Sequence, residues 1–482
     1  MNAMVPAVVL TAAACAMTGV VAGLIADMFG RRTMALLLVA SGLASASAAG
    51  IWRLWSGPSV PEVGVFVAGG GHTSLASLMY ALAAASVVAG VGTLRARERG
   101  VAMAALVALG AVLSHALLAT TDVMVLFIAL SGLAVIGYAL TAGRGTERSI
   151  AAAVRYLVQG VIASGLTVYG LAIVFGLSGG APDLLAARET LAQAPTAPAL
   201  AGMALVLAAL AFKLGAFPFH SWVPDVYGEA DRASVAFLGS VPKVAVVVAL
   251  LVLLRGTAFA SGGFAVASQV VIVLALGSLV FGSFGMLRER SVARLLGYSA
   301  IAQVGYALLG VGSGDAGIVA TTIFVVTYAV AVAAAFVGLE AIGAQDPRWD
   351  GSLAGLAGLG RRAPVTAAAM TAVIMSLTGM PLFAGFWGKL HVILALVGAG
   401  RTGVAVVAVL AAVVSFGGYG AVVRAMYFED AAHEDLAVRS SRTMSGSGYA
   451  VVVLVALAVA LVALGVVPLV SGVARVYAVF SL

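Results

Sequence analysis

Long apolar stretches, separated by short polar gaps, follow one another along almost the whole chain. Fourteen of them are about 20 residues long or longer, the length that an α-helix needs to cross the hydrocarbon core of a bilayer. The pattern therefore predicts an all-α polytopic membrane protein that forms a single membrane domain over residues 1–482. The predicted spans are residues 5–27, 33–52, 73–93, 100–119, 122–142, 150–176, 198–217, 233–254, 265–287, 292–311, 316–342, 364–397 (broken), 401–426 and 448–472.

Most arginines lie in the polar gaps, and alternate gaps receive very different numbers of them. When the gaps are assigned alternately to the two sides of the membrane, sixteen arginines fall on one side and five on the other. Arginine-rich loops stay in the cytoplasm, so we expect a multi-pass protein of the bacterial plasma membrane with both termini on the outer side. The sixteen are Arg31, Arg32, Arg95, Arg97, Arg99, Arg144, Arg148, Arg232, Arg288, Arg290, Arg294, Arg348, Arg361, Arg362, Arg439 and Arg442; the five are Arg53, Arg188, Arg255, Arg401 and Arg475.

The composition agrees with a membrane protein and excludes several other classes. Apolar residues make up 62% of the chain and charged residues only 9%, against about 25% charged residues in soluble domains. The net charge of +7 follows from the arginine-rich loops and does not indicate nucleic-acid binding. The single cysteine, Cys15, lies in the first span, which excludes a disulfide framework and a thiolate metal site. No phosphate-binding loop, metal cluster or catalytic triad is visible.

Three lysines stand apart from this pattern, because Lys213, Lys243 and Lys389 are the only lysines in the chain and each lies inside an apolar stretch. A cation at the centre of a membrane helix costs roughly 3 kcal/mol even on lenient scales. We therefore expect the three ammonium groups to lie in a protein-lined interior, along one polar track, and to change protonation state there, which arginine does not do. The alternative is that these side chains snorkel to an interface.

A proline lies close to one of these lysines at two places: Pro218 directly follows the span 198–217, and Pro381 lies inside the span 364–397. Proline removes a helical hydrogen bond, and freed backbone groups in a membrane need protein or water around them. We therefore expect both helices to be interrupted and both interruptions to face the bundle interior. Corresponding broken helices point to inverted repeats, here about residues 100–254 and about residues 265–426. A simple packing kink is the alternative.

Few other titratable residues occur inside the predicted spans. His220 and His391 each lie close to a lysine, and His115 is in the middle of the fourth span. Imidazole can relay protons near neutral pH, although a histidine at a helix break can also be purely structural. Asp225 is expected to anchor the turn after the seventh span, and Glu340 is expected to be the solvated end of the eleventh.

Several motifs resemble those of the antiporter-like subunits of respiratory complex I. The stretch 211–227 carries the longest of them, and its Pro-Asp-Val-Tyr ending is similar to subunit N, whereas subunits L and M and the Mrp antiporter subunits usually read Pro-Asp-Ala-His. The other motifs are Asp122–Phe127, Arg155-Tyr156, Pro242-Lys243, Arg294–Tyr306 and Gly379–Lys389. Together the motifs extend the resemblance from about residue 65 to about residue 430.

The resemblance implies fourteen helices in two inverted five-helix repeats, with helices 7 and 12 broken. It implies that Lys213 is the lysine of helix 7, Lys243 its relay partner on helix 8, and Lys389 the helix 12 lysine that faces the outlet. It further implies a proton-translocating membrane subunit of an NADH–quinone oxidoreductase, coupled to quinone reduction elsewhere. NADH, FMN, iron–sulfur clusters and quinone would be bound by partner subunits and none by this chain. The expected partners are other membrane subunits and the lipid bilayer, without nucleic acid.

The chain departs from the family at one position. A glutamate on helix 5 of the family pairs with the helix 7 lysine, but here Ser131 follows the Leu-Phe-Ile-Ala-Leu run, and residues 123–146 contain no acid. We therefore expect no carboxylate within ion-pair reach of Lys213, about 4 Å. Two alternatives remain open: a subunit of a cation/proton antiporter or membrane-bound hydrogenase-like complex, and a structural subunit with impaired pumping.

Overall fold

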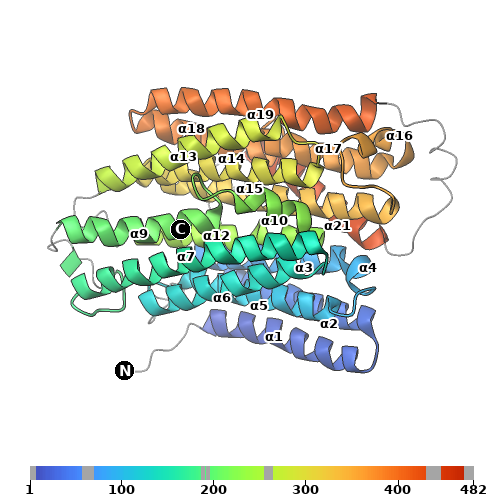
Figure 1. Ribbon diagram of the computed structural model, residues 1–482, viewed down its shortest axis with the longest axis horizontal. Helices are drawn as coiled ribbons and strands as arrows, with labels where there is room; N and C mark the ends of the chain where they lie inside the picture. Colours follow the sequence, from blue (N-terminus) through green and yellow to red (C-terminus); the bar gives the residue numbers. More distant parts are fainter. Residues whose placement is uncertain are drawn as a thin grey trace.

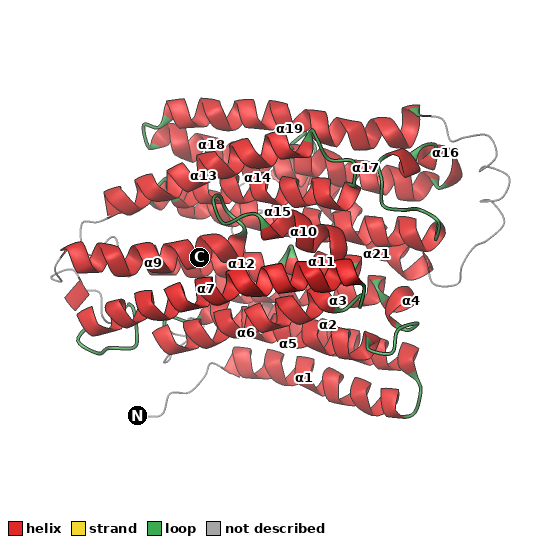
Figure 2. Ribbon diagram, in the orientation of Figure 1, coloured by secondary structure: helices red, strands yellow, loops and turns green. Residues whose placement is uncertain are grey.

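The fold is a bundle of long helices that run side by side along one direction, horizontal in Figure 1, with α1 at one edge and α19 at the other. A computed structural model describes residues 7–56, 70–185, 190–191, 196–254, 264–429 and 447–471. Within those residues the only β-structure is a pair of isolated bridges (Figure 2). The helices are α1 (Ala7–Met28), α2 (Arg32–Ser56), α3 (Gly70–Ala89), α4 (Val91–Leu94), α5 (Gly100–Ala119), α6 (Val123–Ala142), α7 (Glu147–Leu177), α9 (Thr196–Leu214), α10 (Trp222–Glu229), α11 (Arg232–Leu238), α12 (Val241–Leu253), α13 (Phe264–Met286), α14 (Val292–Val311), α15 (Asp315–Gln345), η2 (Ala354–Leu356), α16 (Leu359–Arg362), α17 (Pro364–Thr378), α18 (Ala384–Gly398), α19 (Thr402–Phe428) and α21 (Ser447–Ser471).

The described helices agree with the predicted spans. Thirteen of them are long and apolar enough to cross a membrane, and they coincide with thirteen of the fourteen predicted segments. The remaining segment, predicted as broken, is formed by the two shorter apolar helices α17 and α18. The prediction of an all-α, multi-pass membrane protein is therefore confirmed.

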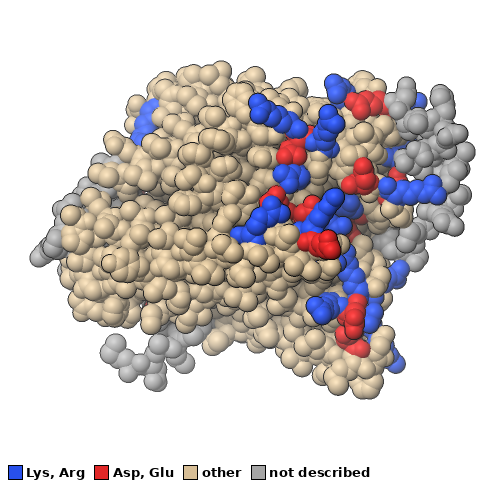
Figure 3. Space-filling view, viewed as in Figure 1, with Lys and Arg blue, Asp and Glu red and all other residues tan. Residues whose placement is uncertain are grey.

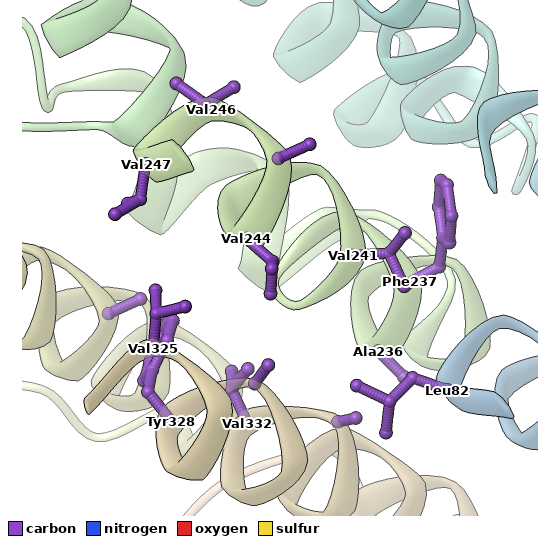
Figure 4. Close-up of a cluster of buried hydrophobic side chains, with 14 of the residues drawn as sticks. Leu82, Ala236, Phe237, Val241, Val244, Val246, Val247, Val325, Tyr328 and Val332 are labelled. Carbon is purple, nitrogen blue, oxygen red and sulfur yellow. The ribbon is translucent and has the colours of Figure 1, made fainter. Parts of the chain in front are cut away.

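Helix α15 lies at the centre of the bundle, and its most apolar stretch is buried on every side. A helix that is apolar all round, as this one is, is typical of such a position. Helices α11 and α12 pack against it, and Figure 4 shows Val244 of α12 close to Val325 and Val332 of α15, with Leu82 of α3 completing the cluster. By contrast, α7 and α19 expose most of their apolar surface, as expected of helices that face lipid or a neighbouring subunit.

Charged side chains gather at one end of the bundle. In Figure 3 almost all of the visible lysine, arginine, aspartate and glutamate side chains lie over the end where Figure 1 places α4 and α16. This is the end that the sequence assigns to the arginine-rich loops. Five of the assigned arginines lie outside the described residues, as do the termini 1–6 and 472–482. These arginines are Arg188, Arg255, Arg439, Arg442 and Arg475.

Two stretches of the chain share local features in the same order. Helices α6 and α14 each have 20 residues, and α7 and α15, which follow them, each have 31. The residue before α6, Asp122, and the residue before α14, Ser291, both cap their helix through a side-chain oxygen. Each also forms an isolated β-bridge with a residue that follows the 31-residue helix, Asp183 in one stretch and Ser352 in the other.

The eighth span contains an interruption that the sequence analysis missed. Residues 233–254 were expected to form one helix, but α11 ends at Leu238 and α12 begins at Val241. Pro242 stands in the first turn of α12 and has no N–H to continue the helical hydrogen bonds. The hydroxyl of Ser240 donates to the carbonyl of Ala236 at 2.5 Å, so this side chain is satisfied by the helix that precedes the break.

Close packing of α13 against α14 gives a first prediction. A side-chain carbon on Gly282 would overlap the backbone of Ala302, and overpacking costs typically about 1–3 kcal/mol. We expect Gly282→Leu to lower the midpoint of thermal unfolding in detergent. Gly165→Leu is the control, because a side chain there meets no atom within 4 Å. Equal midpoints for the two variants would show that this contact does not limit stability.

Candidate functional site

The ammonium group of Lys389 is held by the end of a helix. Lys389 lies on α18, and its Nζ donates hydrogen bonds to the carbonyls of Leu377 and Thr378, both at 2.9 Å. These are the last carbonyls of α17, which have no partner within that helix and carry the negative end of its dipole. The face of Tyr306 lies 4.9 Å from the same Nζ. A cation that is only 7% exposed is thus surrounded by electron-rich groups.

The break between α17 and α18 makes this arrangement possible. Gly379 adopts a left-handed conformation with φ of 87° and turns the chain out of α17. The Ser376 hydroxyl then accepts a hydrogen bond from Gly385 N across the break, at 3.1 Å. On the far side, Trp387 Nε1 donates to the carbonyl of Gly465 on α21 at 2.8 Å. These two bonds hold the start of α18 against α17 and α21.

The two interruptions were expected to face the bundle interior, and at the end of α17 the freed carbonyls do so, although the proline rings themselves do not. Pro218 and Pro381 are exposed on the surface of the chain, and Leu382 beside Pro381 is 57% exposed. A proline ring has no N–H to satisfy, and it can therefore lie at an apolar surface. The carbonyls that the breaks release point inward instead, where Lys389 binds Leu377 and Thr378.

A small cavity extends from Lys389 to Tyr328 of α15. Its volume is about 10 Å³, which is room for roughly one water molecule. Its polar lining consists of Gln303, Thr327, Tyr328, Ser376 and Lys389. The Tyr328 hydroxyl also accepts a hydrogen bond from Lys243 Nζ at 3.5 Å. Two of the three buried lysines are therefore connected through one phenol hydroxyl and one water-sized space.

Lys243 lies on α12, just after the break between α11 and α12, and is 2% exposed. Its Nζ is 5.5 Å from the centre of the Tyr227 ring and 5.8 Å from that of Tyr328. Cation–π attraction from two rings offsets part of the lost hydration. Like Lys389, this lysine is buried in the interior of the chain and does not snorkel.

Lys213 differs from the other two lysines. It is the last residue but one of α9, and its Nζ is buried without a hydrogen-bond partner among the described residues. No ion pair to it occurs there either, as the absence of an acid near Ser131 predicted. The break that follows is satisfied without the lysine, because Trp222 Nε1 donates to the Phe212 carbonyl at 3.0 Å and Phe217 N donates to the Ser278 hydroxyl at 2.9 Å.

The three histidines are not bonded to the lysines in the part of the chain that the structure describes. His115 Nδ1 lies 3.3 Å from the Tyr80 hydroxyl, and His391 Nδ1 lies 2.8 Å from the Trp387 carbonyl of its own helix. His220 Nδ1 is buried without a hydrogen-bond partner among the described residues, and its ring packs on Phe281. A role in proton relay therefore stays a prediction for all three.

The prediction for Asp225 is confirmed, and the prediction for Glu340 is wrong. Asp225 on α10 does anchor its segment: its carboxylate accepts from Arg155 of α7 and from Arg294 of α14, each at 3.0 Å. Glu340 is not a solvated helix end, because it is 3% exposed. The helix continues five residues beyond it to Gln345 and packs against neighbours there, which keeps water from the carboxylate. The described residues contain no cluster of metal-ligating side chains.

The sequence analysis did not single out the groups that support Lys389. Gln303 Nε2 donates to the Leu377 carbonyl at 2.8 Å and to the Tyr419 hydroxyl at 3.1 Å, and Tyr419 lies 2.5 Å from the Ser299 hydroxyl. An amide inside an otherwise apolar span was the available signal for Gln303. Tyr419 gave no such signal, because an isolated tyrosine in a membrane helix is common and its partners come from another helix.

Comparison with known proteins places this site in a family context. Residues 120–415 match the family described as "NADH:quinone oxidoreductase/Mrp antiporter, TM". The NADH-quinone oxidoreductase subunit N of Granulibacter bethesdensis is 38% identical over 323 residues, which are 65% of this chain and 66% of that protein. The subunit N of Sphingopyxis alaskensis is 34% identical over 68% of this chain and 67% of its own length. The alignments thus span about two thirds of these relatives.

Solved structures extend the similarity to almost the entire chain. A chain of respiratory complex I from Thermus thermophilus superposes with a TM-score of 0.77 and 27% identity, covering 95% of this chain and 98% of its own. Chains of an archaeal membrane-bound sulfane sulfur reductase and of the Mrp complex from Dietzia give TM-scores of 0.83 and 0.76, both at 22% identity. The coverages are 98% of both chains for the first, and 97% of this chain and 99% of the other for the second. The latter two similarities concern the fold alone.

Contact between Gly379 and Lys389 gives a second prediction. A side-chain carbon on Gly379 would lie 2.9 Å from Lys389 Cδ and would also have to adopt a left-handed conformation, which costs roughly 1–2 kcal/mol. We expect Gly379→Ala to displace the Lys389 ammonium from its carbonyls and to reduce any activity that depends on Lys389. Gly400→Ala separates the two effects, since Gly400 has φ of 72° but no neighbour within 4 Å. Equal activities would argue against a role for this contact.

Proposed function

This chain belongs to the NADH:quinone oxidoreductase/Mrp antiporter transmembrane family, and we propose that it is a proton-translocating membrane subunit of an NADH–quinone oxidoreductase of the subunit N type. The observation that carries the proposal is the connection from Lys243 through the Tyr328 hydroxyl and a water-sized cavity to Lys389. Lysines can exchange protons, hydroxyl and water can pass them on, and the surrounding helices exclude bulk water.

Proton transfer through this unit follows from the chemistry of its groups. A neutral Lys243 amine can accept a proton, and its ammonium form donates to the Tyr328 oxygen. A water molecule in the cavity would bridge Tyr328 to Lys389, whose charged form is stabilised by the Leu377 and Thr378 carbonyls. A proton would thus move from Lys243, whose charge few groups stabilise, to Lys389, whose charge two carbonyls stabilise.

The remaining parts of the proposal concern the setting of this unit. We place the chain in the bacterial plasma membrane with its arginine-rich end in the cytoplasm, and we assign residues of about 100–254 and 265–426 to two inverted repeats. The paired helix lengths and β-bridges support the repeats. NADH, FMN, iron–sulfur clusters and quinone would be bound by partner subunits, so the redox reaction would take place outside this chain. His115, His220 and His391 remain candidates for relaying protons to and from the lysines.

A second candidate, a subunit with impaired pumping, has one observation in its favour. The Lys213 ammonium has no partner among the described residues, and Ser131 replaces the acid that pairs with its counterpart in the family. We therefore propose that transfer depends mainly on Lys243 and Lys389 and that Lys213 contributes little.

Replacement of Lys389 tests the proposed function. We expect Lys389→Ala to lower NADH-driven proton uptake by inverted membrane vesicles by roughly 10-fold or more, since a positioned proton-transfer group contributes about 10²–10⁴-fold. Uptake is measured with a pH-sensitive dye, and assembly is checked by the amount of complex in the membrane. Lys213→Ala is the matched control and should have a much smaller effect. Normal uptake in an assembled Lys389→Ala complex would refute the proposal.

Removal of one hydroxyl tests the link between the two lysines. Tyr328→Phe keeps the ring that faces Lys243 but removes the oxygen that accepts its hydrogen bond. We expect slower proton uptake with unchanged thermal stability. Tyr449→Phe on α21, which is 37% exposed, serves as the control. If both variants transport protons at the wild-type rate, the Tyr328 hydroxyl is not on the route.

A further inference from the structure

A buried group of charges lies at the arginine-rich end, beneath the helix that leads to Lys243. It comprises Glu340 of α15, Asp231 and Arg232 at the start of α11, and Arg97 between α4 and α5. Both carboxylates are buried, Glu340 at 3% and Asp231 at 5% exposure. Arg97 forms an ion pair with Asp231. The sequence had indicated a solvated position for Glu340, so its burial calls for a different explanation.

Glu340 is the member of this group without a close cationic partner. The Thr93 hydroxyl, which donates to the Gly90 carbonyl at 3.1 Å, lies beside its carboxyl group, and among the described residues no ion pair within 4 Å includes Glu340. Arg232, on the neighbouring helix α11, is engaged elsewhere: it donates to the Leu339 carbonyl at 3.2 Å and stacks on the Trp349 ring at 4.7 Å. A buried carboxylate that serves only structure is usually paired directly, and Glu340 is not.

The position of Glu340 connects it to the site. It lies on the same helix as Tyr328, twelve residues further on, which is roughly 18 Å along the axis. Helix α11 packs against α15 and leads from Arg232 to the break at Ser240 and then to Lys243. A route between the arginine-rich end and Lys243 would therefore follow the contact between α11 and α15.

Polar groups occur within that interval. The Ser240 side chain is fully buried at the helix break. The Tyr227 hydroxyl lies next to Gly239, 3.0 Å from where a side-chain carbon on this glycine would be, and the Tyr227 ring faces both Phe336 and the Lys243 ammonium. The Tyr227 hydroxyl lies beside the Tyr328 hydroxyl but forms no hydrogen bond of normal geometry among the described residues. A water molecule next to it would join it to the Lys243–Tyr328 pair.

We propose that Glu340 is the proton-accepting group on the arginine-rich side that supplies Lys243. Water at that end protonates the Glu340 carboxylate, and the proton passes by way of water and the Tyr227 hydroxyl to the neutral Lys243 amine, which regenerates the carboxylate. Arg97, Asp231 and Arg232 keep the local charge balanced as Glu340 changes state. This inference rests on the proposed function, since it gives the Lys243–Lys389 unit a source of protons.

Glu340→Gln is the direct test, because glutamine preserves the shape and the polar contact with Thr93 but cannot carry the proton. We expect proton uptake by inverted vesicles to fall about tenfold, within the range of a lost general acid–base group, and Glu340→Asp to restore part of it. Glu147→Gln is the matched control, an exposed glutamate at the same end, and should behave as wild type. A purely structural Glu340 would leave Glu340→Gln at the wild-type rate, which would overturn the inference.

Two further measurements separate the possible outcomes. If Lys389→Ala impairs uptake and Glu340→Gln does not, the inference fails and the proposed function stands; if Lys389→Ala is also without effect, the proposed function fails. Should Glu340→Gln not assemble, infrared spectroscopy of the Thr93→Val complex decides. Loss of the Thr93 hydroxyl should shift the carbonyl band of protonated Glu340 during turnover, and the absence of any such band in the wild-type complex would overturn the inference.

Discussion

A positive charge in an interior shielded from bulk water needs compensating groups, and the rest of this structure is organised around that requirement. At Lys389 the compensation comes from backbone carbonyls, because the chain stops α17 at the level where the ammonium lies. A continuous helix would have used these carbonyls in its own hydrogen bonds. The break is therefore the means by which an apolar bundle binds a cation without a carboxylate. Glycine at 379 provides the turn, and Gln303 shares the Leu377 carbonyl and keeps it in place.

The two helix breaks differ in how far they compensate the charge of the nearby lysine. Around Lys213 the carbonyl at the end of the helix goes to Trp222, and the following backbone N–H goes to Ser278. The lysine itself is left without a partner among the described residues. The family provides a glutamate for the lysine at this place, and Ser131 cannot replace its charge. The lysine at the first break is therefore left without compensating groups among the described residues, while the lysine at the second break is bound by two carbonyls.

Some features of this structure could be predicted from the sequence, and others could not. The lengths of the spans, the position of the arginines in loops and the burial of the lysines could be predicted. Each depends on the free energy of transferring one segment into a membrane, which does not require knowledge of the other segments. The side of the helix on which Pro218 and Pro381 lie could not be predicted, because it depends on which neighbouring helix binds the released carbonyls. Glu340 was misjudged for the same reason: its burial results from α4 and α11, which are distant in sequence. Gln303, Tyr419 and the Leu377 carbonyl form a hydrogen-bond network only where three helices, α14, α19 and α17, meet.

The size of the cavity between Tyr328 and Lys389 has a consequence for ion selectivity. Its volume of about 10 Å³ accommodates roughly one water molecule, whereas a sodium ion would need several oxygen ligands or its hydration shell around it. The lining offers two hydroxyls, one phenol and one amide but no carboxylate, and an ammonium group already occupies one wall. A metal cation would therefore meet both a steric and an electrostatic barrier. A proton avoids the steric barrier, because it moves by exchange between fixed groups, and it avoids the electrostatic one when the Lys389 amine is neutral and takes it up.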